Sequence, residues 1–460
     1  MPVKWLRSLG LAIAVAQCVC AASVRAQEPA PAPAAPANSQ SAPGAANPAV
    51  LQLTLKQAVE LALKQNPQRV IAKILLFESE RNSQIARAPL LPHASIDGAA
   101  ALSQYNLQIV ESQPHPVDAG PYQYLDVGPS FSQTLLNLPL IRAYQAGREG
   151  VKQARSDERT AREIAVQATV NQYLLILRAL ADREAAQSRV DLAQRLYEQA
   201  SQLQKNGIGL NIDTTRANVE LQNEKQNLID ADTATRTTKY QLAALLDLPR
   251  AQELDVVDRL SFFDLPAMEK EALVTEALAD RPEMRSFDSQ QRIAHLNTDA
   301  AGEQRLPELA FDGFWHYQAK HISDGVPGYT YEITLAFPLF TGGRIHAEEA
   351  KSKLEEQRVA ENRKQLEAQI VSDVKTAFDQ LAAARTSVDV ANLGLKLAQD
   401  EVAQAQRRFA AGVTTNVEVI TAQDALARAS DNQIAALYNF NLSRALLARA
   451  TGDIEGMYTK

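Results

Sequence analysis

A helical pattern of unusual length limits the folds open to this 460-residue chain more than any other feature. From Ile345 to Ala411 the pattern has no break, and large apolar residues recur at every seventh position: Val374, Leu381, Val388, Leu395, Val402 and Phe409. An alanine follows most of them three places later, which gives the heptad seam of a coiled coil. A helix of roughly 65 residues that rises 1.5 Å per residue is about 100 Å long, so we expect a rod or tube rather than a globule.

The seam occurs twice, which indicates a duplication. Four alanines stand 205 positions before Ala384 and the alanines that follow it in the later seam: Ala179, Ala186, Ala193 and Ala200. Each long helix is predicted to end at a glycine, Gly207 or Gly412, because glycine just beyond the last turn is a common helix stop. We therefore divide the folded part into repeats at 51–260 and 261–460, each with a helix, two strands and a long helical hairpin.

The N-terminus has the composition of a secretory signal peptide, predicted at 1–26. Basic residues precede an apolar run over 9–22, and Val24 and Ala26 are small residues that a signal peptidase accepts. The run is shorter than the about 20 apolar residues that span a bilayer, which argues against a membrane anchor. No later apolar run is long enough for a transmembrane helix either.

Both cysteines, Cys18 and Cys20, lie in the predicted signal. A lipid anchor at one of them is an alternative, although neither follows the small residue that a lipoprotein signal favours. Cleavage after Ala26 would leave a chain without disulfides, thiolate nucleophiles or cysteine metal ligands. Residues 27–50 are mostly Ala, Pro, Ser, Gly and Asn, the composition of a flexible linker.

Charge and motifs exclude several classes of function. Cleavage removes three of the 47 basic residues and none of the 54 acidic ones, so the net charge changes from −7 to −10. An acidic chain is a poor ligand for nucleic acid. No P-loop, dinucleotide fingerprint or His-Glu-x-x-His motif occurs. We predict no catalytic residue, metal site or cofactor, and hence no enzyme.

Two pairs of strands are predicted ahead of the long helices, at 94–110 and 122–138 and at 309–323 and 329–339. Strands of about 10 residues with one apolar face and aromatic ends are typical of transmembrane β-barrels, with a soluble antiparallel sheet as the alternative. The apolar face of the first strand changes parity near Ser103, which suggests a β-bulge. Because membrane barrels have at least about 8 strands and leave no open edge in lipid, several chains would share one barrel.

The last strand runs directly into the second long helix through a compact corner. Pro338 ends strand pairing because it has no N–H, and Phe340 adds an apolar side chain. Gly342 and Gly343 allow the sharp change of backbone direction that sends the chain from a sheet into a helix.

From 51 to 453 the chain resembles the outer-membrane efflux proteins, or TolC-like channels. The resemblance rests on three features: the opening segment 53–67, the corner 338–344 and the two glycine-centred tips. It implies a mixed α+β membrane protein, a homotrimer with a long antiparallel α-helical coiled-coil barrel in the periplasm. Each chain would give four strands to a shared transmembrane β-barrel of about 12 strands in the outer membrane. The implied partners are outer-membrane lipid, a periplasmic membrane-fusion (adaptor) protein and an inner-membrane pump of RND, ABC or MFS type.

The resemblance also implies a periplasmic gate at the tips, with acidic residues six places after each tip glycine, here Asp213 and Glu418. Adaptor docking is assigned to both tips: Gly207, Ile208, Gly209 and Leu210 in the first, and Gly412, Val413 and Thr414 in the second. An alternative is that the two acidic residues only stabilise the first turn of a helix. Thr414 and Thr421 replace charged residues of the family pattern, which predicts a weaker charge-paired latch.

The leading hypothesis is an outer-membrane channel-tunnel component of a tripartite efflux or type I secretion system, which conducts cargo passively. The alternative is a soluble periplasmic coiled-coil adaptor or scaffold. The residues leave the cargo open among drugs, metals, siderophores and proteins, because a tunnel selects by size and charge.

Overall fold

The computed structural model of the chain describes residues 50–106, 118–207, 209–263, 266, 268–319 and 323–459. Apart from the first 48 residues, the chain forms one compact unit. The predicted signal peptide, nearly all of the linker, Ile208, positions 107–110 of the first predicted strand and positions 320–322 of the third lie outside the described residues.

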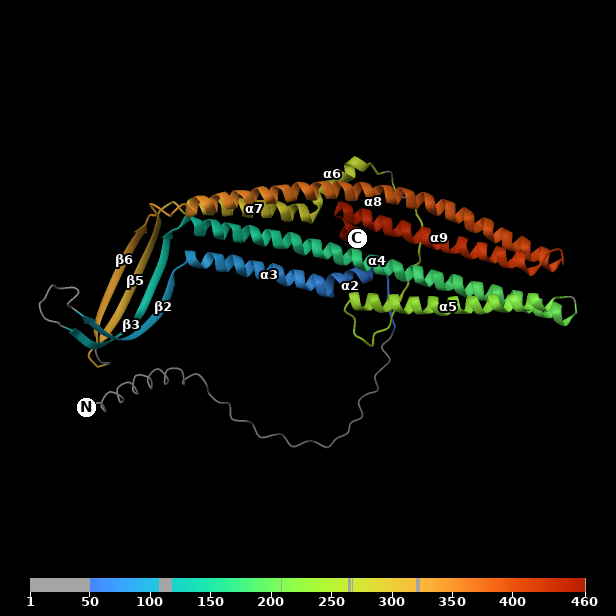
Figure 1. Cartoon of the computed structure of the whole chain (residues 1–460), viewed down its shortest axis with the longest axis horizontal. Helices are drawn as coiled ribbons and strands as arrows, with labels where there is room; N and C mark the ends of the chain where they lie inside the picture. Colours follow the sequence, from blue (N-terminus) through green and yellow to red (C-terminus); the bar gives the residue numbers. More distant parts are fainter. Residues whose placement is uncertain are drawn as a thin grey trace, which may run out of the picture. The chain divides into compact units, whose positions relative to one another are not determined.

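The two halves of this unit contain the same elements in the same order (Figure 1). The first half has α2 (Leu55–Gln65), α3 (Pro67–Arg87), β2 (His93–Asn106), β3 (Asp118–Leu136), α4 (Leu138–Lys205) and α5 (Asn211–Leu245). The second half has α6 (Lys270–Asp280), α7 (Pro282–Glu303), β5 (Glu308–Ala319), β6 (Val326–Ala336), α8 (Arg344–Ala410) and α9 (Asn416–Thr451). The short elements are β1 (Leu51–Leu53), η2 (Ala88–Leu90), β4 (Leu254–Val256) and α10 (Ile454–Thr459).

Local sequence explains where the first helices begin. Thr54 and Gln57 form a capping box, in which each side chain accepts a hydrogen bond from the other residue's backbone N–H. Asn66 caps α3, since its side-chain oxygen accepts hydrogen bonds from the backbone N–H groups of Gln68 and Arg69. Pro67 follows it at the first helical position, where a missing N–H costs nothing. A single residue therefore separates α2 from α3.

The long helices α4 and α8 have 68 and 67 residues, close to the expected length. Near the sheet, α3 packs on α4, α4 on α7 and α7 on α8. Toward the tips, α5 packs on α4, α4 on α9 and α9 on α8 (Figure 1). The second-half helix that contacts α4 is therefore α7 near the sheet and α9 toward the tips.

The heptad positions lie inside this layer of helices. In α8 the large residues Val374, Leu381, Val388 and Val402 are buried, whereas Leu395 is only half-buried. In α4 the four alanines at the matching register are all buried: Ala179, Ala186, Ala193 and Ala200. Alanine at these positions allows helix axes to approach toward the ~8 Å end of the usual packing range.

The four long strands form one antiparallel sheet in the order β2-β3-β5-β6. Leu309 lies opposite Leu335 and Phe311 opposite Ile333, so one face is apolar, and the other carries pairs such as Asp312 with Glu332. The expected bulge is present, since the register of β2 against β3 shifts between Ser103 and Tyr105. Among the described residues, no strand pairs with the outer edge of β2 or β6.

The sequence did not predict a second, two-stranded sheet that ties the chain's start to the end of the first half. Leu51–Leu53 pairs in parallel with Leu254–Val256. Beside it, the buried Tyr173 donates a hydrogen bond to the carbonyl of Leu53 (2.9 Å) and to Asp258 (2.8 Å). Strands of three residues are too short to show a periodic pattern.

One part of α4 corrects the expectation that no later segment suits a membrane span. A window of 18 residues within this helix is apolar enough to cross a bilayer by length and composition, and half of that window is buried in the fold. The core helix of a soluble domain has the same properties, so this window alone is weak evidence for a span.

Candidate functional site at the helical tips and the joint between the halves

Each predicted tip glycine lies two positions after the last residue of a long helix. Gly207 and Gly412 have left-handed backbone angles, with φ of +76° and +68°. Gly209 lies against the end of α4, where an added Cβ would stand 2.8 Å from the backbone nitrogen of Gln204. Only glycine fits such an approach without a shift of the backbone, so the first tip is held closely against its own helix.

The tips also expose apolar side chains. Leu210 in the first tip and Val413 in the second are both about two-thirds exposed, at 66% and 69%. Thr414 donates a hydrogen bond to Glu418 within the second tip. Exposed apolar residues beside polar ones are suited to contact with another protein.

The two acidic residues assigned to the gate have partners within their own hairpins. A carboxylate oxygen of Asp213 lies 3.9 Å from Arg216, one turn along the same helix. Glu418 lies 3.0 Å from Nε of Arg408 at the end of α8. No ion pair joins either residue to the other hairpin within the described part of the chain, so these two carboxylates do not latch the tips together. The ion pair between Arg189 of α4 and Asp431 of α9, at 2.9 Å, joins the hairpins farther from the tips.

A neutral hydrogen bond joins the two hairpins instead. Asn416, the first residue of α9, donates from Nδ2 to the backbone carbonyl of Asp213 at 2.9 Å. Apolar residues of four helices surround this point: Leu196, Ala200, Ala217, Val402, Ala405, Phe409, Val419 and Ala422. The sequence did not identify Asn416, because a single asparagine near a helix start is a common capping residue.

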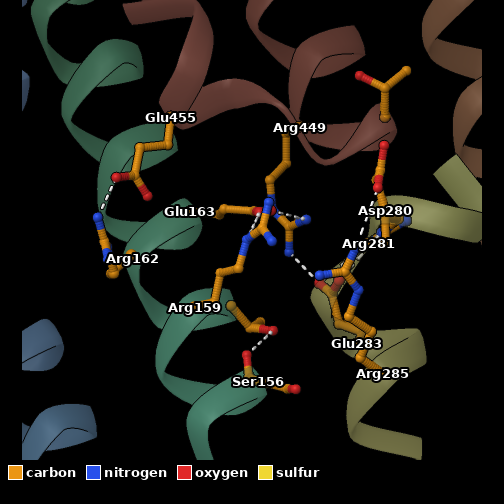
Figure 2. A network of polar contacts seen from close by, with 12 residues as sticks. Ser156, Arg159, Arg162, Glu163, Asp280, Arg281, Glu283, Arg285, Arg449 and Glu455 are labelled. Carbon is orange, nitrogen blue, oxygen red and sulfur yellow. Dashed lines mark hydrogen bonds and ion pairs between the residues drawn. The ribbon is translucent and has the colours of Figure 1, made fainter. Parts of the chain in front are cut away.

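A second polar site, also absent from the sequence predictions, lies where the two halves meet. We define the joint cluster as six charged residues from four helices and the α6–α7 turn: Arg159, Glu163, Arg281, Glu283, Asp373 and Arg449. Arg449 of α9 lies between two carboxylates, 3.1 Å from Glu163 and in an ion pair with Glu283. Figure 2 shows these side chains converging from α4, α7 and α9.

The remaining members complete the charge balance of the joint cluster. Arg281 lies 3.3 Å from both Glu283 and Asp373, and Arg159 lies 3.7 Å from Glu163. The end of α9 reaches this point because Gly452 has no Cβ, which would meet the backbone of Arg281 at 3.3 Å. The cluster therefore connects α4 of the first half to three helices of the second.

The pKa values of the two glutamates, Glu163 and Glu283, are shifted in opposite directions. The side chain of Glu163 is only 1% exposed, and this burial raises its pKa to about 7 against the opposing effect of Arg449. Burial acts on Glu283 in the same direction, but the charges and hydrogen bonds of Arg449 and Arg281 leave its pKa below the usual value.

The corner after β6 has the backbone expected of a sharp turn. Gly342 and Gly343 have φ of +62° and +81°, and Gly343 precedes the first residue of α8. The strand ends at Ala336, two residues before Pro338, and Phe340 is 90% exposed. The corresponding corner of the first half needs no glycine pair, because Asn137 caps α4 directly.

No group of three or more His, Cys, Asp or Glu side chains that could hold a metal ion occurs within the residues that the structure describes. The joint cluster is instead a set of mutually paired charges, and the tips are a hairpin-to-hairpin contact.

Comparisons with known proteins agree with the fold. The solved outer membrane channel CmeC of Campylobacter jejuni superposes with a TM-score of 0.77 at 17% identity, over 87% of this chain and 85% of CmeC. Pyoverdine export outer membrane protein OpmQ of Pseudomonas aeruginosa is 24% identical over 299 residues, which cover 63% of this chain and 61% of OpmQ. The alkaline protease secretion protein AprF of the same organism is 25% identical over 350 residues, 71% and 70% of the two chains.

The family comparison covers most of the folded part. The model of the outer membrane efflux proteins matches residues 58–247 and 273–453, one segment in each half. This match confirms the resemblance carried by the opening segment, the corner and the tips. The chain belongs to the outer membrane efflux protein family.

Proposed function

We propose that this chain is the outer-membrane channel component of a tripartite efflux or type I secretion system. It would conduct cargo passively, with energy supplied by an inner-membrane pump and contact relayed by a periplasmic adaptor. The observation that carries the proposal is a sheet with one apolar face and two edges that no described strand pairs with. The sheet is joined to helices of about 100 Å, in a member of the outer membrane efflux protein family.

The unpaired edges support assembly from three chains. An open edge cannot remain in lipid, and the edges of β2 and β6 differ in sequence, so they suit head-to-tail pairing in a closed ring. Three sheets of four strands would give a barrel of about 12 strands, within the range of known membrane barrels. Exposed apolar side chains on β6, such as Ile333 and Leu335, would then face lipid.

The helices support the same ring. Near the sheet the helix layer has α3 at one edge and α8 at the other, and toward the tips it has α5 and α8. Uncovered apolar side chains follow these edges, including Ile71, Ile74 and Leu75 on α3 and Val390, Leu393 and Leu397 on α8. Neighbouring chains would cover them and close a periplasmic tunnel.

We assign the adaptor contact to the tips and the signal peptide to residues 1–26. The exposed Leu210 and Val413 would meet the adaptor, together with the tip glycines and Thr414. The same proposal includes an inner-membrane pump of RND, ABC or MFS type and an N-terminus without a lipid anchor. The names of the relatives give two kinds of cargo, pyoverdine for OpmQ and alkaline protease for AprF.

Reconstitution tests this function. We expect the mature protein to require detergent for extraction, to migrate as a trimer and to carry current in planar lipid bilayers. A water-soluble monomer without conductance would contradict the channel and favour the periplasmic scaffold.

The gate assignment has its own test in Asp213 and Glu418. In a trimer these residues would place six carboxylates at the tunnel entrance, so neutralising them should reduce the preference for cations or increase the closed-state leak. The double variant D213N/E418Q is compared with the wild type by reversal potential and leak current. Unchanged selectivity together with unchanged leak would reject the assignment and limit both residues to helix stabilisation.

A further inference from the structure

Asn416 is a polar side chain at a position built for an apolar one. The residue is fully buried, with none of its surface exposed, and Val419 and Ala217 beside it are equally buried. Its amide nitrogen donates to the carbonyl of Asp213 on the opposite hairpin, while its amide oxygen is buried without a partner. Burying an amide with only one of its groups satisfied costs stability, so packing alone does not explain an asparagine here.

Gln423 provides an internal comparison. It lies seven residues after Asn416, and therefore at the same heptad position of α9, and it is 9% exposed. Its amide nitrogen is buried without a partner. Both residues place an amide in the seam, but only Asn416 uses it to reach the other hairpin.

The bond from Asn416 is also the single polar link between α5 and α9. No other hydrogen bond or ion pair joins these two helices among the described residues. Glu220 of α5 and Asp424 of α9 repel each other. Burial raises the pKa of Glu220, and the charge of Asp424 raises it further. Like charges on the two helices favour separation, and the Asn416 bond opposes it at the tips. Farther from the tips, Arg189 of α4 opposes it as well, because it lies 3.4 Å from Glu224 of α5 and 2.9 Å from Asp431 of α9.

We infer that Asn416 is the positioning residue that holds the α5 and α9 tips together in the closed arrangement, and that its bond to the Asp213 carbonyl breaks when the tips open. This inference rests on the proposed channel function and adds a residue to its gate. In coiled coils, a buried asparagine fixes register at some cost in stability, which is the behaviour that a reversible latch requires.

The test compares N416L, N416D and Q423L with the wild type as detergent-purified trimers in planar bilayers. Leucine keeps the branched shape and the number of heavy atoms of Asn416 without a donor, and aspartate keeps its size and shape without one. We expect N416L and N416D to raise the fraction of time spent open about fivefold to tenfold, the population change expected from loss of one buried hydrogen bond. Q423L should match the wild type, because it removes no contact between hairpins.

The outcomes separate the inference from the function. If the wild type forms channels but N416L and N416D have the same open fraction as the wild type, the inference alone is overturned. An equal rise in the open fraction of Q423L would overturn it as well. Failure of both Asn416 variants to form trimers, with Q423L intact, would assign the residue to folding and also overturn it. Wild-type protein that forms no channels would overturn the proposed function, and the inference with it.

Discussion

Glu163 is the most deeply buried charged residue that the structure describes, and its environment shows how individual residues connect the two halves. Two arginines, Arg449 and Arg159, face its carboxylate, and Glu283 competes for Arg449. The raised pKa of Glu163 and the lowered pKa of Glu283 mean that the cluster is stabilised mainly through Glu283. A buried ion pair of this kind fixes geometry more reliably than it adds stability.

Replacement of Glu163 by glutamine should make the protein more stable at pH 8 and change it little at pH 5. A folded-state pKa near 7 against 4.5 in the unfolded chain means that the folded protein binds more protons across this range. The contribution of Glu163 to stability therefore falls as pH rises from about 4.5 to 7, by about 3 kcal/mol at most. Thermal unfolding midpoints of detergent-solubilised E163Q and wild type at both pH values measure this.

The matched control is E283Q, which should have the opposite sign. Its lowered pKa means that the charged carboxylate stabilises the fold above about pH 4.5, and this contribution is lost as pH falls through the folded-state pKa. E283Q should therefore be less stable than the wild type at pH 8. An E163Q protein that melts below the wild type at pH 8 would contradict the raised pKa of Glu163.

At the scale of helices and strands, the sequence predicted best those elements whose hydrophobic pattern extends over many residues. The two long helices, their glycine ends and the order of elements in each half follow from heptads and stop signals that extend over many turns. Strand ends were less certain: β6 ends at Ala336 rather than 339, because the chain turns toward the corner before Pro338. In the first pair the expected bulge is present, and β3 spans Asp118–Leu136 where the prediction was 122–138.

Contacts between distant residues could not be predicted in this way. Glu163 and Arg449 are 286 positions apart, and the Asn416 link to Asp213 spans 203 positions. Neither residue belongs to a local motif, and each has a common alternative role as a surface charge or a helix cap. The same limit applies to the pairing of β1 with β4.

The heptad seam makes a direct prediction for packing. Ala384 is buried in α8, whereas Ala382, two residues before it, is exposed. Ala384→Leu adds volume to a filled seam and should destabilise the protein by about 1–3 kcal/mol, while Ala382→Leu should stay within about 0.5 kcal/mol. Thermal unfolding of both variants measures the difference, and equal midpoints would mean that the seam is not close-packed at Ala384.

At the scale of the whole assembly, the arrangement of helices predicts which helices move when the tips open. Helix α4 packs on α7 near the sheet and on α9 toward the tips, and the joint cluster lies at this change of neighbour. Opening of the tips would then move α5 and α9 and leave the helices beyond the cluster in place. The segment that moves would extend from the Asn416–Asp213 hydrogen bond at the tips to the joint cluster.

Cysteine cross-linking between the open sheet edges tests the shared barrel most directly. Three double variants are used, in which S95C on β2 is combined with T330C, E332C or T334C on β6. The two native cysteines lie in the predicted signal, so each mature variant has no other cysteine. All four positions share the polar face of the sheet. Within one chain these edges are three strand spacings apart, about 14 Å, which is too far for a disulfide.

Oxidation of the membrane-embedded protein should give covalent dimers and trimers and nothing larger in at least one of the three pairs. Each single-cysteine variant should give no trimer. Monomers alone in all three pairs, or a ladder that continues beyond three chains, would contradict a barrel closed by three copies of this chain.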